Sequence, residues 1–138
     1  MTDSISTHQG GCECGAVRYR VRGAMRGVVN CHCKQCRRIH GHFGAYTSVE
    51  RTQLTLINDA GLKWYRSSAA VRRGFCGHCG ASLFWDNEQL ATISIAAGTL
   101  DDPTGLKSIA HIYTADAGDY YHIDDDLAKY PGSMRDAT

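Results

Sequence analysis

The chain has 138 residues, 43% of them hydrophobic, and its 15 Lys and Arg against 14 Asp and Glu leave a formal net charge of +1. This length suits one domain with its own core, and the balanced charge gives no general attraction to nucleic acid or to an anionic membrane. The polar start, MTDSISTHQG, lacks the apolar run of a secretory signal, and no later segment approaches the roughly 20 apolar residues of a membrane span.

Hydrophobic residues along the chain indicate mostly β-strands. Val17, Tyr19 and Val21 alternate with arginines, as in a strand with one buried face. Runs rich in β-branched and aromatic residues, separated by Gly, Asn and Asp, predict further strands at residues 43–49, 53–58, 62–68, 82–86, 91–98 and 107–114. Two short helices are expected, at 34–40 and near 124–130, and residues 132–138 are expected to fray. The predicted fold class is mainly β, in one domain over residues 1–138.

Seven cysteines fall into three clusters. Without an export signal they favour a cytoplasmic protein whose cysteines bind metal or do chemistry rather than form disulfides. The pairs Cys12/Cys14 and Cys76/Cys79 share one design, in which two thiols are followed at once by a glycine and then by a strand. Since zinc takes four thiolates tetrahedrally, we expect these four cysteines to form one closed, structural zinc site.

The remaining cysteines, Cys31, Cys33 and Cys36, lie on one short segment and have no obvious fourth partner. A zinc with three protein ligands and one open position is typical of a catalytic site. The alternative is a closed second site, with His40 or His42 as its fourth ligand. His32 lies inside the motif, where its side chain is expected to point away from the metal. The sequence thus predicts two zinc ions, one structural and a second whose fourth position is either open or closed by a histidine.

A zinc held by three thiolates carries a net charge of −1 and favours a soft fourth ligand such as a substrate thiolate. Chemistry at a substrate sulfur is therefore the natural function. Arg37 and Arg38 are candidates for offsetting the negative charge or holding a substrate carboxylate, or are simply solvated.

Other side chains are read as structural. Trp64, Trp85, Tyr120 and Tyr121 are predicted to fill the core, and His111 to pack on a strand. The acidic run Asp124, Asp125 and Asp126 is predicted to cap the second helix.

Five segments resemble the glutathione-dependent formaldehyde-activating enzyme family, to which centromere protein V is related. They are GGCECGAVRYRV, CHCKQCRR, GFCGHCGASLFW, AAGTLDDPTGL and HIYTADAGDYYHIDDDLAKYPG, and they run in order from about Gly10 to Gly132. The resemblance implies small β-sheets arranged as a tent around zinc, with a core at about residues 10–132. It also implies the metal division drawn above, with a structural zinc on the two pairs and a catalytic zinc on the cluster of three.

The activity implied by the resemblance is addition of glutathione to formaldehyde, which gives S-(hydroxymethyl)glutathione and is classed as carbon–sulfur lyase chemistry. We therefore expect a zinc enzyme acting on a small thiol such as glutathione together with formaldehyde or another carbonyl, with no membrane or nucleic-acid partner. The competing interpretation is a non-catalytic, zinc-scaffolded binding module for a protein or nucleic acid.

Overall fold

The computed structural model describes residues 6–134, and within them it has eleven β-strands, one α-helix and three short 3-10 helices. The ends of the predicted single domain and most of the predicted frayed tail lie outside these residues. The chain divides into two compact units, one formed by Met1–Arg26 with Thr47–Gly105 and the other by Gly27–Tyr46 with Leu106–Thr138. The prediction of a mainly β fold is confirmed.

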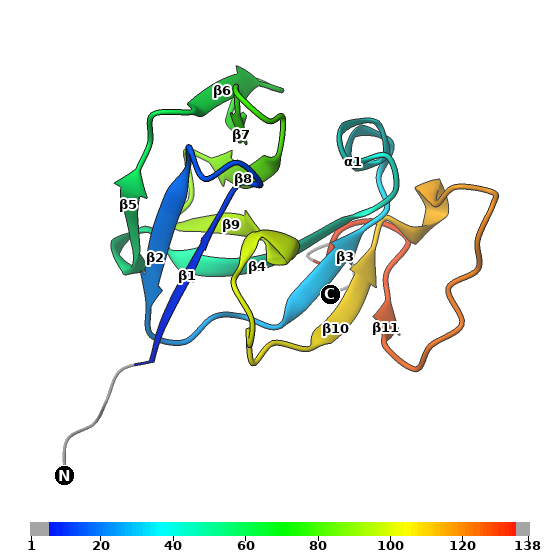
Figure 1. Ribbon diagram of the computed structural model, residues 1–138. Helices are drawn as coiled ribbons and strands as arrows, with labels where there is room; N and C mark the ends of the chain where they lie inside the picture. The colour runs from blue at the N-terminus through cyan, green and yellow to red at the C-terminus, as the bar shows by residue number, and fades with distance from the viewer. Residues whose placement is uncertain (1–5, 135–138) are drawn as a thin grey trace, which may run out of the picture. The chain divides into compact units, whose positions relative to one another are not determined.

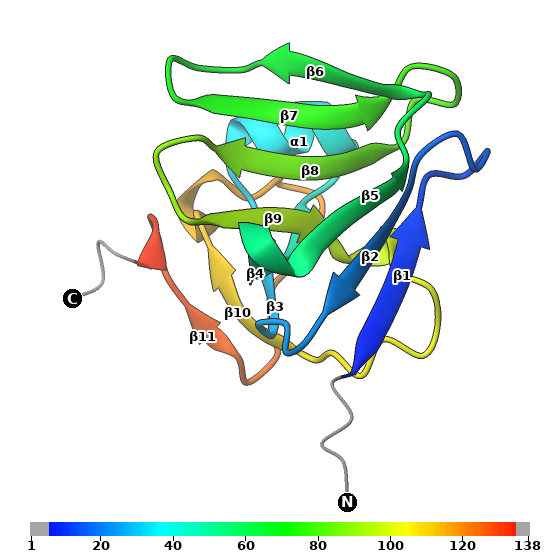
Figure 2. The ribbon, with the colours of Figure 1, turned by 90° about the vertical axis from the view of Figure 1, so that its left-hand side faces the viewer.

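The first unit contains two sets of strands. Three strands pair in the order β1 (Thr7–Gly11), β2 (Arg18–Arg22) and β5 (Leu54–Asn58), and all the pairings are antiparallel. Four more strands follow one another as antiparallel neighbours, and Figure 2 shows them stacked edge to edge. These are β6 (Leu62–Arg66), β7 (Val71–Cys76), β8 (Ser82–Asn87) and β9 (Thr92–Ala96). Two 3-10 turns, Arg51–Gln53 and Ala97–Thr99, belong to the same unit.

The core of the first unit confirms the alternation seen in the sequence. Val17, Tyr19 and Val21 are fully buried, whereas the arginines between them are not. Tyr19 packs edge-on against Phe84 with ring centroids 5.5 Å apart, and its hydroxyl shares a 2.7 Å hydrogen bond with Thr99 Oγ1. The buried hydroxyl is thus satisfied, so the aromatic side chain can contribute roughly 1.5–3 kcal/mol of hydrophobic stabilisation.

In the second unit, β3 (Val28–Cys31) pairs antiparallel with the start of β4 and parallel with β10 (Ser108–Ile112). A two-residue strand, β11 (Ala128–Lys129), continues the ladder beyond β10, as Figure 1 shows. Strand β4 (Gly44–Glu50) runs from this unit into the first, and a 3-10 turn follows β10 at Thr114–Asp116.

The predicted helix at residues 34–40 is confirmed as α1 (Lys34–His40). Cys33 caps its start, and Gly41, with a left-handed φ of 77°, ends it by donating its N–H to the Arg37 carbonyl. The helix predicted near 124–130 is wrong, because that segment forms turns and the short strand β11. Asp125 accepts hydrogen bonds from the Leu127 N–H and Lys129 Nζ, and such local bonds compete with helix formation.

Sequence patterns also missed three strands. Strand β1 contains adjacent glycines, β3 is buried at three of its four positions without alternation, and β7 carries Arg72, Arg73 and Gly74 in its centre. Each pattern has low strand propensity or lacks the period of two, so pairing with neighbouring strands decided the outcome.

Candidate metal centres and their surroundings

The two cysteine pairs of the first unit meet at one place. Cys12 and Cys14 lie between β1 and β2, Cys76 ends β7, and Cys79 follows in the turn before β8. All four sulfurs lie within 4.8 Å of one another. The Cys12–Cys14 and Cys14–Cys76 sulfur separations are 3.7 and 3.8 Å. Sulfurs bound at about 2.3 Å to one tetrahedral zinc would lie about 3.8 Å apart, so the group fits this ion closely.

The backbone around this four-cysteine group follows the glycine pattern of the sequence. Gly15 and Gly80, each directly after the second cysteine of a pair, have left-handed φ values of 85° and 82°. The turns they make let backbone N–H groups face the sulfurs: Val17 donates to Cys12 Sγ at 3.2 Å, and His78 donates to Cys76 Sγ at 3.3 Å. Such N–H donors stabilise thiolates, which are the metal-binding form of cysteine.

The four thiols cannot all ionise without a cation between them. A backbone hydrogen bond from Ala81 is the main reason that the pKa of Cys79 is lowered to about 6. Cys14 receives a backbone hydrogen bond from Ala16, yet desolvation and the neighbouring thiols raise its pKa to about 12. One pKa is lowered and the other raised because neighbouring thiolates repel each other, and a dication bound between them would remove this repulsion.

The three-cysteine cluster lies in the second unit, where β3 passes into α1. Cys31 is the last residue of β3, Cys33 is the helix N-cap, and Cys36 lies buried in the first helical turn. Their three sulfurs lie within 4.8 Å of one another. Hydrogen bonds from the thiols of Cys31 and Cys36, and from the Cys36 N–H at 3.3 Å, hold the pKa of Cys33 far below its usual value, whereas the Cys33 interaction raises that of Cys31.

No fourth ligand joins this cluster: among residues 6–134, no other His, Cys, Asp or Glu ligand atom lies within 4.8 Å of all three sulfurs. The two histidines considered as closing ligands bond elsewhere. His40 Nε2 lies 2.6 Å from the Tyr46 hydroxyl, and His42 Nδ1 lies 2.6 Å from the Tyr120 hydroxyl. The cluster therefore has three protein donors, which suits a metal ion with one position left for another ligand.

A hydrogen-bonded chain of side chains begins at His32, between two cysteines of this cluster. His32 Nδ1 is bonded to the Tyr121 hydroxyl, His32 Nε2 lies 2.9 Å from His111 Nδ1, and His111 Nε2 lies 2.8 Å from Asp125 Oδ2. His32 is fully buried, and burial is the main reason that its pKa is lowered to about 4. The hydrogen bond from His111 is the main reason that the pKa of Asp125 is lowered to about 2.

When both histidines are neutral, the carboxylate at the end of this chain sets the direction of every bond in it. Asp125 can only accept, so a neutral His111 donates from Nε2 and accepts at Nδ1. A neutral His32 must then donate from Nε2 and accept at Nδ1. The Tyr121 hydroxyl is thereby fixed as a donor to His32, and its oxygen lone pairs remain available to accept a hydrogen bond.

Sequence reasoning placed the cysteines correctly in two groups but did not find this chain. It read Tyr121 and His111 as packing residues and the aspartates as a helix cap, whereas Asp125 binds His111. Tyr120 was predicted in the core but is 60% exposed. His32 and His111 are 79 residues apart, and the parallel pairing of β3 with β10 brings them together. No local spacing in the sequence signals such a pair.

Arg37, one of the two candidates for holding a substrate carboxylate, uses one terminal nitrogen to donate to the Asp116 carbonyl at 3.1 Å. In the part of the chain that the structure describes, no helix has the length and apolar character needed to cross a membrane.

Two comparisons with known proteins bear on the family and the fold of the chain. A family model described as glutathione-dependent formaldehyde-activating enzyme matches residues 7–116. The crystal structure of a Rhodobacter sphaeroides protein aligns with a TM-score of 0.59 and 21% sequence identity, over 68% of this chain and 88% of that one. At this identity the structural match shows a shared fold and nothing more.

Proposed function

Because the chain belongs to the glutathione-dependent formaldehyde-activating enzyme family, we propose that it is a zinc enzyme that joins a small thiol to a carbonyl carbon. Glutathione and formaldehyde are the pair that the family description suggests, and cleavage of the adduct would be the reverse, lyase-type reaction. The observation that carries the proposal is the cluster of Cys31, Cys33 and Cys36, which has three donors and no fourth within 4.8 Å among residues 6–134.

The proposal divides two zinc ions between the cysteine groups. Cys12, Cys14, Cys76 and Cys79 would hold a structural ion, because four thiols leave no position for a substrate. Cys31, Cys33 and Cys36 would hold the catalytic ion. When bound there, zinc would lower the pKa of a thiol at its open position, so that the thiolate persists near neutral pH.

The reaction itself needs only one new bond and one proton transfer. The thiolate sulfur attacks the carbonyl carbon, the π electrons move to the oxygen, and that oxygen takes up the proton that the thiol released. The product is a hemithioacetal bearing a hydroxyl group.

The proposal also covers the domain organisation of the enzyme and its cellular compartment. Both metal groups would belong to a single zinc-binding domain over residues 1–138, with its core at about residues 10–132. Seven free thiols grouped as metal ligands favour a reducing compartment, and we place the protein in the cytoplasm on that ground.

Exchange spectroscopy with ¹³C-labelled formaldehyde and glutathione tests this function. The zinc-loaded protein should accelerate interconversion of formaldehyde and the adduct above the rate in buffer. Cys33→Ser should abolish the acceleration and lower the zinc content from two ions to one, because two thiols no longer complete the site. Tyr120→Phe, which changes an exposed side chain outside both cysteine groups, should retain the acceleration. An unchanged rate in the presence of fully loaded protein would contradict the proposed activity.

A further inference from the structure

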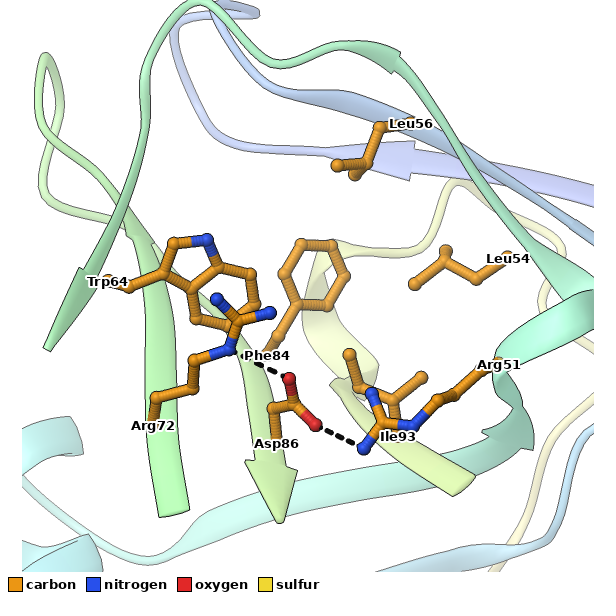
Figure 3. Close-up of a pocket in the computed structure, with 8 residues that line it drawn as sticks. All are labelled: Arg51, Leu54, Leu56, Trp64, Arg72, Phe84, Asp86 and Ile93. Atoms are coloured by element: carbon orange, nitrogen blue, oxygen red, sulfur yellow. Dashed lines mark hydrogen bonds and ion pairs between the residues drawn. The ribbon is translucent and has the colours of Figure 1, made fainter. Parts of the chain in front are cut away.

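The first unit contains a cavity of about 200 Å³ that includes neither cysteine group. Figure 3 shows Trp64, Phe84, Leu54, Leu56 and Ile93 around an open space, with charged side chains along one side. Phe84 and Ile93 are buried and form its inner part, whereas Leu56 is 40% exposed, so the cavity reaches the surface. Trp64, predicted from the sequence as a core residue, lines this cavity.

A buried carboxylate organises the charged side. Asp86 is fully buried, and each of its oxygens accepts one ion-paired hydrogen bond: Oδ1 from Arg51 Nη2 at 2.5 Å and Oδ2 from Arg72 Nε at 2.9 Å. Arg51 is further held by the backbone, since it donates to the carbonyls of Leu90 and Asn87 at 2.9 Å each. Arg51 therefore uses Nε and one terminal nitrogen on the protein itself.

Arg72 is arranged differently, with its terminal nitrogens left for a ligand. Its guanidinium carbon lies 3.8 Å from the centre of the Trp64 ring, so the group is stacked on an aromatic face. Its contacts with Asp86 and Glu88 both use Nε. Among residues 6–134 no group accepts a hydrogen bond from its two terminal nitrogens, and the side chain is one-third exposed. Figure 3 shows these nitrogens at the edge of the open space.

The charges around the cavity sum to a small positive value. Arg51, Arg72 and Asp86 together carry +1, and Glu88 is neutralised by Arg66, whose Nη1 lies 2.5 Å from it. One negative charge on a ligand would balance this site. A dianion such as phosphate is disfavoured, because Asp86 lies behind the arginine, and a polar tripeptide does not match walls made of leucine, isoleucine and aromatic rings.

We propose that this cavity binds a small monocarboxylate with an apolar body, such as an aromatic acid. The carboxylate accepts hydrogen bonds from the terminal nitrogens of Arg72, in the planar geometry that guanidinium and carboxylate share. The apolar body covers Trp64, Leu54 and Leu56 and removes their surface from water. This site is separate from the proposed thiol chemistry, and it stands or falls independently of it.

Phenylacetate is a suitable probe for the zinc-loaded full chain. Titration followed by ¹H–¹⁵N NMR should move the indole signal of Trp64, with a dissociation constant in the millimolar range expected for so small a ligand. Trp85 is the internal reference, because it follows Phe84 on β8 and so faces the other side of the strand. Its indole signal should stay in place.

Charge recognition is tested by ligand and by variant. 2-Phenylethanol, which has the same ring without the carboxylate, should bind wild-type protein at least about tenfold more weakly, the loss expected for a charge-assisted hydrogen-bonded pair. Arg72→Gln should weaken phenylacetate binding to a similar extent. Lys63→Gln is the matched control, since Lys63 is an exposed cation next to Trp64 on β6 that does not line the cavity, and it should leave binding unchanged.

Three results would overturn the proposal. Equal binding of the alcohol and the acid would remove the role of charge, even if Arg72→Gln failed to fold. An equal loss in Lys63→Gln and Arg72→Gln would show that only general surface charge matters. Loss of phenylacetate binding in Cys33→Ser, with wild-type behaviour in Arg72→Gln, would show that the acid binds at the three-cysteine cluster instead.

Discussion

Replacing Tyr121 with phenylalanine removes one hydroxyl from the chain that runs through His32 and His111 to Asp125. The ring remains and can keep its packing, but His32 Nδ1 loses its hydrogen-bond donor. Because His32 is fully buried, this nitrogen becomes an unsatisfied buried acceptor. Such a group costs roughly 1–3 kcal/mol, and we expect about 1.5 kcal/mol here because Tyr121 itself is half-buried and water can approach.

Tyr120→Phe provides the matched control for this change. Tyr120 is the adjacent residue, and its hydroxyl also bonds to a histidine nitrogen, His42 Nδ1, at 2.6 Å. Tyr120 differs from Tyr121 in being 60% exposed. Water can replace its hydroxyl, so we expect a loss below about 0.5 kcal/mol.

Urea denaturation of both variants with excess zinc at pH 7 gives the two free energies of unfolding by linear extrapolation. Equal losses in Tyr120→Phe and Tyr121→Phe would refute the ordered chain. A loss near zero in Tyr121→Phe would do so as well.

Three further changes test other parts of the structure. Cys76→Ser and Cys33→Ser should each lower the zinc content from two ions to one by elemental analysis; a drop to zero in either would show that the sites are not independent. Gly80→Ala should cost about 1–2 kcal/mol in chemical denaturation because Gly80 has a left-handed φ of 82°, whereas Gly98→Ala, without such a φ, should be close to neutral. Burial acts to raise the pKa of Asp86, but its bonds to Arg51 and Arg72 lower the pKa overall below the ordinary 3.8. The ionised Asp86 therefore adds to the free energy of unfolding above pH 3.8, and this stabilisation is lost as the pH falls through the lowered pKa. Asp86→Asn should therefore be about 2 kcal/mol less stable at pH 7, after allowance for the partial exposure of both arginines, and the difference should shrink in acid; a constant difference down to pH 2 would contradict the assignment.

The two cysteine groups were predictable from the sequence because their determinants are local. Two closely spaced thiols followed by glycine indicate a tight turn, and the two turns with this pattern, at Gly15 and Gly80, do combine. Elimination then leaves Cys31, Cys33 and Cys36 together. The strand predicted from the alternation at Val17, Tyr19 and Val21 is likewise confirmed, because one face of that strand is buried against the core.

The features that sequence reasoning missed depend on long-range pairing. His32 meets His111 only because β3 lies parallel to β10, and the pocket around Arg72 needs side chains from several strands and from the 3-10 turn before β5. The segment 124–130 has a plausible capping residue, yet the carboxylate of Asp125 accepts hydrogen bonds from His111 and Lys129 instead of capping a helix. Tertiary contacts outweighed the helix propensity of this segment.

The central claim is that the second metal site keeps an open position for a thiol. The cobalt-substituted protein tests this directly, because the visible bands of thiolate-bound cobalt respond to a change of ligand. Titration with glutathione should shift these bands saturably, and S-methylglutathione, which offers no thiolate, should leave them unchanged. The shift should be lost in Cys33→Ser, which retains the four-cysteine site. Bands that stay unchanged up to saturating glutathione would show that the site is closed to thiols, and the proposed chemistry at Cys31, Cys33 and Cys36 would then be wrong.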